Sequence, residues 1–246
     1  MRLITVPFSH YCEKARWALA YAGIPFVEEG HVPLLHWRAT RAAGGGRTVP
    51  VLVADGAVLA DSTDILRFCD RRLSAARRLY PAAEDAAVAA LEDRFDEELG
   101  PHVRRVAYRH ALPDRRLILR LTRDLVPRWE LAVLRATYPL AHAYLARALA
   151  IDDATTARSL AAVESVWRDV DALLADGRRH LVGDRFTAAD LTFAALGGPL
   201  VMPPEYARIP RESTAPAPLR ALAARLRATR PGAFALRLYR DHRAPC

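Results

Sequence analysis

The stretch LITVPFSHYC (residues 3–12) carries an apolar strand pattern followed by an S-x-x-C motif, Ser9 and Cys12, at the start of a helical pattern. A hydroxyl and a thiol placed there lie among the unpaired N–H groups of a helix N-terminus, whose partial positive charge favours a thiolate. The stretch TVPVL (residues 48–52) follows, and a proline that opens a strand leaves backbone groups that can pair with a peptide-like ligand. Together the two stretches indicate a site for a small thiol.

The composition is that of a globular protein with an arginine-rich surface. The chain has 246 residues, of which 52% are apolar and 26% charged, enough for one large domain or two small ones. Its net charge of +8 comes almost wholly from arginine, because Lys14 is the only lysine. The arginines are scattered, without a basic tract or an RNA-binding signature, so a nucleic-acid partner is not expected. The sequence contains no apolar run of about 18 residues, so no membrane span is predicted.

The cysteines and the N-terminus bear on the cellular compartment. Three cysteines, Cys12, Cys69 and Cys246, are odd in number and do not form a disulfide framework. We expect the thiol of Cys246, the last residue, to be exposed and without function. The N-terminal apolar run is too short for a secretory signal, so a cytoplasmic protein is expected. No zinc-ligand spacing or phosphate loop occurs, and neither a metal nor a nucleotide is predicted.

The N-terminal part alternates strand and helix patterns. Residues 2–6 and 26–28 are predicted strands, and apolar spacing over 13–22 predicts a helix that ends at Gly23. These elements form a βαβ unit with parallel strands. A short helix is expected within 30–47.

A hairpin and a helix complete this part. The strands of the hairpin are predicted over 49–53 and 57–59, because Asp55-Gly56 is a strong turn signal. Ser62 then caps a helix. The predicted order is therefore βαβ–ββα.

Only helical patterns follow for about a hundred residues. We predict helices over 83–110, 114–126, 128–149, 154–175, 187–197 and 218–230, a loop over 198–216, and an irregular tail over 231–246. The helix after Phe186 begins with a capping box between Thr187 and Asp190.

The N-terminal motifs, together with KARWAL (14–19), Asp61-Ser62 and FTAAD (186–190), resemble the glutathione transferase superfamily, in particular bacterial members of the serine or cysteine type. The resemblance implies a thioredoxin-like glutathione-binding domain over 1–76, a linker over 77–86 and an all-helical domain over 87–246. It also implies a homodimer that uses glutathione as a co-substrate in detoxification. In that reaction the glutathione thiolate attacks a small electrophile.

Three residues are candidates for activating the thiol. The resemblance implies that the Ser9 hydroxyl donates to the glutathione sulfur and lowers its pKa, whereas a serine in a loop is usually only a turn or cap residue. Cys12 is the alternative, as the nucleophile of a thiol-disulfide reductase or deglutathionylase. Its position predicts a buried thiol with a raised pKa, which attacks poorly. Tyr11 is the third candidate, because a phenol can also donate to the sulfur.

The resemblance also assigns the glutathione-binding residues. It implies a cis bond between Val49 and Pro50, with the Val49 backbone facing the cysteinyl part of glutathione. Ser62 and its helix N-terminus would bind the γ-glutamyl carboxylate, and Asp61 the ammonium group. Asp61 is shorter than the glutamate or glutamine more usual in the family. The cations predicted for the glycyl carboxylate are Arg47, His36, Arg38 and Arg41, with Arg47 preferred.

The second substrate is expected against the helical domain, near residues 102–116. The residues proposed for its pocket are His102, Arg105, Tyr108 and His110, although such side chains at helical spacing are more often part of a core. Arg16 is expected to pair with an acid of the helical domain. A non-catalytic binding module on the same scaffold remains a third functional alternative.

Overall fold

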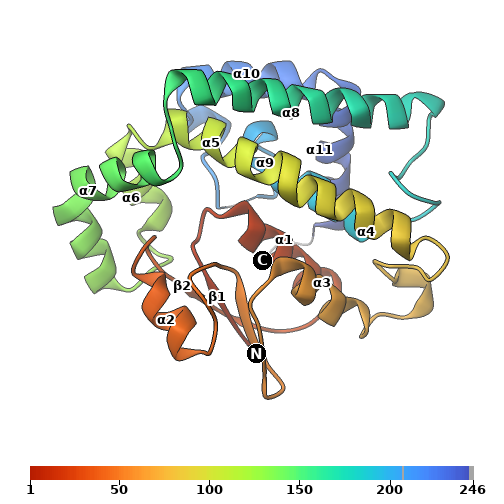
Figure 1. Cartoon of the computed structure of the whole chain (residues 1–246), viewed down its shortest axis with the longest axis horizontal. Coiled ribbons are helices and arrows are strands. Elements are labelled where there is room, and N and C mark those ends of the chain that lie inside the picture. The colour runs from red at the N-terminus through yellow and green to blue at the C-terminus, as the bar shows by residue number, and fades with distance from the viewer. Residues whose placement is uncertain (207, 244–246) are drawn as a thin grey trace.

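The computed structural model describes residues 1–206 and 208–243, and its N-terminal part is built on a small sheet (Figure 1). Its elements are β1 (Arg2–Thr5), α1 (His10–Tyr21), β2 (Val27–Gly30), α2 (His36–Ala42), β3 (Val51–Ala54), β4 (Ala57–Leu59) and α3 (Ser62–Asp70). The sheet has four strands in the order β2-β1-β3-β4, in which β1 runs parallel to β2 and antiparallel to β3. The predicted thioredoxin-like βαβ–ββα order is confirmed.

Local sequence accounts for the sheet. Leu3 of β1 lies opposite Leu52 of β3, and both side chains are buried. The β3–β4 turn places Asp55 at φ 52° and Gly56 at φ 77°, the left-handed conformation that Asp-Gly pairs tolerate well. The register therefore follows from a buried apolar face and a two-residue turn.

Every further element of the described chain is helical, as predicted. These elements are η1 (Ala75–Arg77), α4 (Asp85–Arg94), the π turn η2 (Phe95–Leu99), α5 (Gly100–Ala111), α6 (Arg115–Thr122), α7 (Arg128–Ala148), α8 (Asp153–Leu173), η3 (Leu174–Asp176), α9 (Ala188–Val201), η4 (Glu212–Thr214), α10 (Ala217–Arg227) and α11 (Arg230–His242). In Figure 1 the long helices α4, α5 and α8 run across the half of the molecule opposite the sheet. None of the described helices is both long and apolar enough to cross a membrane.

Helix α9 forms the centre of the core. All of its residues are buried, and it begins with the predicted capping box between Thr187 and Asp190. The helix continues to Val201, beyond the predicted end at 197, because the small residues there allow close packing. An added Cβ on Gly197 would lie 2.9 Å from the Trp167 ring.

The irregular tail predicted over 231–246 is wrong for residues 231–242, which belong to helix α11. Pro231 occupies the first turn of this helix, where a proline is tolerated, and the Thr229 side chain accepts a hydrogen bond from Gly232. Leu238 and Tyr239 are fully buried. The Trp17 indole of α1 donates to the His242 carbonyl at 3.0 Å, so the tail closes the core. Cys246 lies outside the described residues.

A second, smaller apolar cluster joins α6 and α7 to the segment after β2. Its buried members are Val32, Ala111, Leu112, Leu117, Ile118, Leu134 and Tyr138. The Glu130 carboxylate of α7 accepts a hydrogen bond from the Val32 backbone at 2.8 Å and lies 2.6 Å from Nδ1 of His31. These contacts hold α7 against the edge of the thioredoxin-like part, beside the cleft described next.

Candidate active site

A cleft of about 450 Å³ lies between the thioredoxin-like part and the helices. One wall brings together residues that the sequence predicted for the site, namely Ser9, Tyr11, His36, Arg47, Val49, Pro50, Asp61 and Ser62. The other wall consists of Arg104, Tyr108, Leu145 and Leu149. The cleft is therefore polar on the side of the sheet and largely apolar on the side of the helices.

Ser9 lies at the mouth of helix α1. It is the N-cap residue, its Oγ accepts a hydrogen bond from the Cys12 N–H at 3.4 Å, and its side chain is half-buried at the cleft. The hydroxyl also lies within hydrogen-bonding reach of the Cys12 thiol, where it opposes the rise in the pKa of that thiol, and it lines the cleft. A ligand atom beside Ser9 also faces the positive end of α1.

Cys12 and Tyr11 have different environments from Ser9. Cys12 is fully buried, and burial raises the pKa of its thiol. The Tyr11 hydroxyl donates to the Asp96 carbonyl at 2.8 Å, and burial followed by the Asp96 charge raises its pKa. Cys12 does not reach the cleft surface, and the proton of Tyr11 is already bonded within the protein.

The backbone at Val49 and the start of α3 form the adjoining part of the cleft. The Val49-Pro50 bond is cis, as predicted, and Val49 forms no hydrogen bond with another described residue. Asp61 is the N-cap of α3, and its Oδ1 accepts from the Thr63 N–H at 2.7 Å. Ser62 follows as the first residue of the helix. Free N–H groups at such a helix start form a site for a carboxylate.

His36 and Arg47 lie at the far end of this wall. The His36 Nε2 donates to the Arg47 carbonyl at 3.0 Å, and its Nδ1 accepts from the Leu34 N–H at 3.1 Å. Burial lowers the pKa of His36, so the neutral ring holds the loop before Thr48 instead of carrying a charge. The Arg47 guanidinium lies over the Trp37 ring, 5.1 Å from its centroid, and is exposed.

The opposite wall differs from the set predicted from sequence. Tyr108 lines the cleft, but His102 and Arg105 do not, because both contact the Ser159 hydroxyl of α8, at 3.1 and 2.6 Å. His110 lines a different hollow, between α5, α8 and α10. Arg104 lines the cleft and was not predicted. The available signal was its position four residues before Tyr108, which places both on one helix face.

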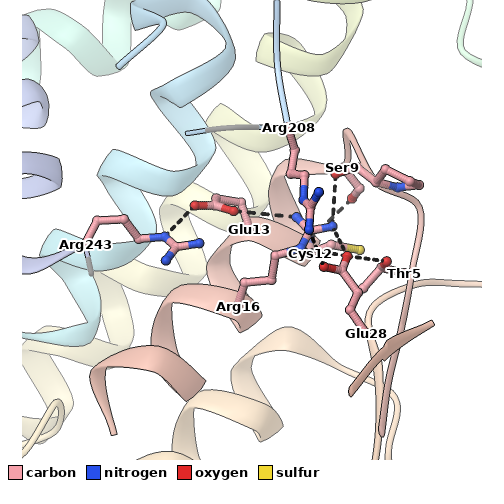
Figure 2. A network of polar contacts seen from close by, with 9 residues as sticks. Thr5, Ser9, Cys12, Glu13, Arg16, Glu28, Arg208 and Arg243 are labelled. Carbon is pink, nitrogen blue, oxygen red and sulfur yellow. Dashed lines mark hydrogen bonds and ion pairs between the residues drawn. The ribbon is translucent and has the colours of Figure 1, made fainter. Parts of the chain in front are cut away.

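A buried ionic network lies beneath Ser9 (Figure 2). Arg16 of α1 pairs with Glu28 of β2 at 2.6 Å and donates to the Pro7 carbonyl at 2.9 Å. The expectation that Arg16 pairs with an acid of the helical part is therefore wrong, since its acids are Glu28 and the neighbouring Glu13. The later part of the chain instead supplies cations, because Arg208 pairs with Glu28 and Arg243 pairs with Glu13.

No group of three or more possible metal ligands occurs within residues 1–206 and 208–243. The cleft presents a serine hydroxyl, two helix N-termini, the backbone of Val49 and the cation Arg47 on one wall and Arg104 on the other. Such a set can bind a small peptide-like anion and stabilise a thiolate at Ser9.

Comparisons with known proteins bear on the N-terminal part and on the fold. Residues 3–76 match the family model described as the glutathione S-transferase N-terminal domain. A glutathione S-transferase of Ceriporiopsis subvermispora, solved in complex with glutathione, has a TM-score of 0.66 and 17% identity over 99% of this chain and 97% of its own. A Populus trichocarpa glutathione transferase has a TM-score of 0.64 and 16% identity over 98% and 93%.

A theta class glutathione S-transferase from Xanthomonas axonopodis pv. citri, with glutathione bound, has a TM-score of 0.57 and 21% identity over 99% of this chain and 97% of its own. A search of curated proteins found no match. Residues 3–76 are thus similar to glutathione S-transferase N-terminal domains, and the chain as a whole has the fold of the solved glutathione transferases.

Proposed function

We propose that this chain is a glutathione-dependent transferase that activates the glutathione thiol at Ser9 for attack on a small electrophile. The observation that carries the proposal is the convergence of Ser9, Val49 and Ser62 on one cleft of about 450 Å³. Two of the structures with the same fold were solved with glutathione. The supporting chemistry is a half-buried hydroxyl that lines the cleft at a helix N-terminus.

Glutathione would lie along the sheet-side wall. Its γ-glutamyl carboxylate would accept hydrogen bonds from Ser62 and the start of α3, and Asp61 would bind the ammonium group. The backbone of Val49 would pair with the cysteinyl unit. Arg47 is the cation proposed for the glycyl carboxylate, and His36 would position the Arg47 segment through its carbonyl.

The sulfur would then lie beside Ser9. The Oγ–H would donate to it and, with the positive end of α1, would favour the thiolate over the thiol. The thiolate attacks the electrophilic carbon, a C–S bond forms, and the leaving group departs with its bonding electron pair. The protein itself forms no covalent intermediate, which distinguishes this mechanism from that of a reductase built on Cys12. A homodimer with a role in detoxification is part of the proposal.

The first test is thermal unfolding with and without millimolar glutathione. A ligand that binds only the native state raises the free energy of unfolding by about 2.7 kcal/mol at a hundredfold excess over its Kd. We expect stabilisation of the wild type, little for Ser62→Ala, and wild-type behaviour for the control Ser74→Ala, whose residue is exposed and far from the cleft in the chain. An absence of stabilisation by glutathione or other small thiols would favour the binding-module alternative.

The second test measures the pKa of the bound thiol from thiolate absorbance as a function of pH. Ser9→Ala should raise that pKa and lower turnover while glutathione still binds. Cys12→Ser should retain activity, because the Cys12 thiol is buried. Loss of turnover in Cys12→Ser with a fully active Ser9→Ala would instead establish the thiol-disulfide alternative.

A further inference from the structure

The helix-side wall of the cleft contains one cation with no internal partner. Arg104 of α5 is half-buried at the cleft, and it forms no ion pair or hydrogen bond with any residue in 1–206 or 208–243. The arginines beside it on α5 are bonded: Arg105 donates to the Leu149 carbonyl at 2.8 Å, and Arg109 pairs with Asp153 at 2.6 Å. Arg104 thus differs from the neighbouring arginines in two ways: it lines the cleft, and no acidic side chain of the described residues pairs with it.

Nearby acids do not supply that anion. The Asp96 carboxylate pairs with Lys14 at 2.6 Å, and the Asp61 carboxylate caps α3. The charge of Arg104 acts on the two tyrosines that line the cleft, because it opposes the rise in the pKa of Tyr11 and of Tyr108. A guanidinium partly removed from water gains most from a ligand oxyanion, which it can bind through two parallel hydrogen bonds.

The surroundings of Arg104 add an apolar requirement. Tyr108 lies one helical turn further along α5, with its ring 5.9 Å from that of Phe8. Leu145 of α7 and Leu149, the C-cap residue of that helix, complete the wall. A ligand that fills this wall therefore presents an apolar body to the tyrosine and leucines and an anionic group to the arginine.

We propose that Arg104 makes the second-substrate half of the cleft selective for electrophiles that carry a carboxylate or sulfonate on an apolar body. The reaction with such an electrophile rests on the proposed transferase function, whereas the binding of the anion does not. Arg104 is a specificity-determining residue here: it holds the anionic end while the thiolate at Ser9 attacks the electrophilic carbon.

The binding test needs no thiol. Fluorescence titrations would compare anilinonaphthalene sulfonate with phenylnaphthylamine, which has the same apolar skeleton and no anion. We expect Arg104→Gln to weaken the binding of the sulfonate about tenfold, which is about 1.4 kcal/mol, and to leave the binding of the neutral probe unchanged. Arg104→Lys should retain part of the affinity. Arg109→Gln is the matched control, because it removes the same charge from the same helix outside the cleft.

The turnover test uses a matched pair of electrophiles, chloronitrobenzoate and chloronitrobenzamide. In both, thiolate attack on the ring carbon releases chloride with the bonding electrons. Arg104→Gln should raise KM for the benzoate alone and leave the benzamide and the pKa of the bound thiol unchanged.

Two results would overturn the assignment. Equal weakening of the charged and the neutral probe would show that Arg104 only shapes the wall. A raised pKa of the bound thiol, with both electrophiles slowed equally, would assign Arg104 to the thiolate. If the wild type turns over neither electrophile, the transferase proposal fails while the probe titrations still decide the role of Arg104.

Discussion

Arg16 and Glu28 join the first helix to the second strand through a single carboxylate oxygen. The Arg16 Nε and Nη2 donate to Oε1 of Glu28 at 2.9 and 2.6 Å, and the same Nη2 donates to the Pro7 carbonyl at 2.9 Å. Because Pro7 lies two residues before Ser9, this pair holds the β1–α1 connection, and with it the proposed catalytic hydroxyl. The pair therefore links the stability of the domain to the geometry of the cleft.

Glu28→Gln should lower the free energy of unfolding by about 3 kcal/mol near neutral pH, because it leaves the buried Arg16 charge poorly compensated. Urea unfolding measures the change. Arg2→Gln is the control, because it removes an ion pair in which the side chains of Arg2 and Glu29 are 47% and 33% exposed. This variant should change the free energy of unfolding by less than about 1 kcal/mol. Similar losses in the two variants would refute the special role of the buried pair.

The Glu28 contribution should also depend on pH. Burial favours the neutral acid, but the Arg16 charge and hydrogen bonds outweigh it and lower the pKa of Glu28 below its ordinary 4.5. The stabilisation is therefore complete above pH 4.5 and is lost as the pH falls through the lowered folded-state pKa. The wild-type and Glu28→Gln unfolding curves should converge in strong acid.

His10 should make the protein sensitive to mild acid. Burial, followed by the Arg104 charge, lowers its pKa from 6.5 to about 3, so the folded protein keeps the ring neutral while the unfolded chain protonates it. Stability is then greatest above pH 6.5 and falls toward pH 3, with a slope of up to about 1.4 kcal/mol per pH unit from this residue. His10→Gln should flatten the measured pH dependence, and parallel curves for the two proteins would contradict the assignment.

Lys14 should couple the two parts of the molecule. Its ammonium is fully buried and lies 2.6 Å from Asp96 and 2.8 Å from Glu92, both in the helical part. Lys14→Met leaves these two carboxylates without a cation, at a cost of about 3–5 kcal/mol in the free energy of unfolding. Denaturant unfolding followed by fluorescence would measure the loss. A double variant, Lys14→Met with Asp96→Asn, should recover part of it, and no recovery would mean that lost packing is the cause.

Gly30→Ala should displace α7 from the sheet edge. An added Cβ would lie 2.1 Å from the Leu125 carbonyl oxygen, a backbone atom in the turn before α7, so that turn must move. We expect lower stability and, because Leu145 lies on α7 and Leu149 caps it, weaker binding of apolar probes in the cleft. The control is Gly46→Ala, where an added Cβ meets nothing within 4 Å. Unchanged probe affinity in Gly30→Ala would show that binding in the cleft does not depend on the position of α7.

Much of the fold and the sheet-side wall was predictable because the signals are local. The Asp55-Gly56 turn, the Thr187 capping box and the helix starts at Ser9 and Asp61 each depend on dihedral preferences and hydrogen bonds within a few residues. A local signal also accounts for the wrong prediction of an irregular tail. Pro231 breaks a helix when it lies in the interior, but the first turn of α11 accepts it.

By itself the sequence determined the order of strands and helices, the thiol-site motif and the resemblance to glutathione transferases. Only the tertiary structure decided that Arg104 rather than Arg105 faces the cleft, that α7 supplies Leu145 and Leu149, and that Arg16 pairs with Glu28. The physical reason is the separation along the sequence between the residues that interact. Helix caps and turns are determined by neighbouring residues, whereas the partner of a buried charge and the wall of a cleft depend on how distant helices pack.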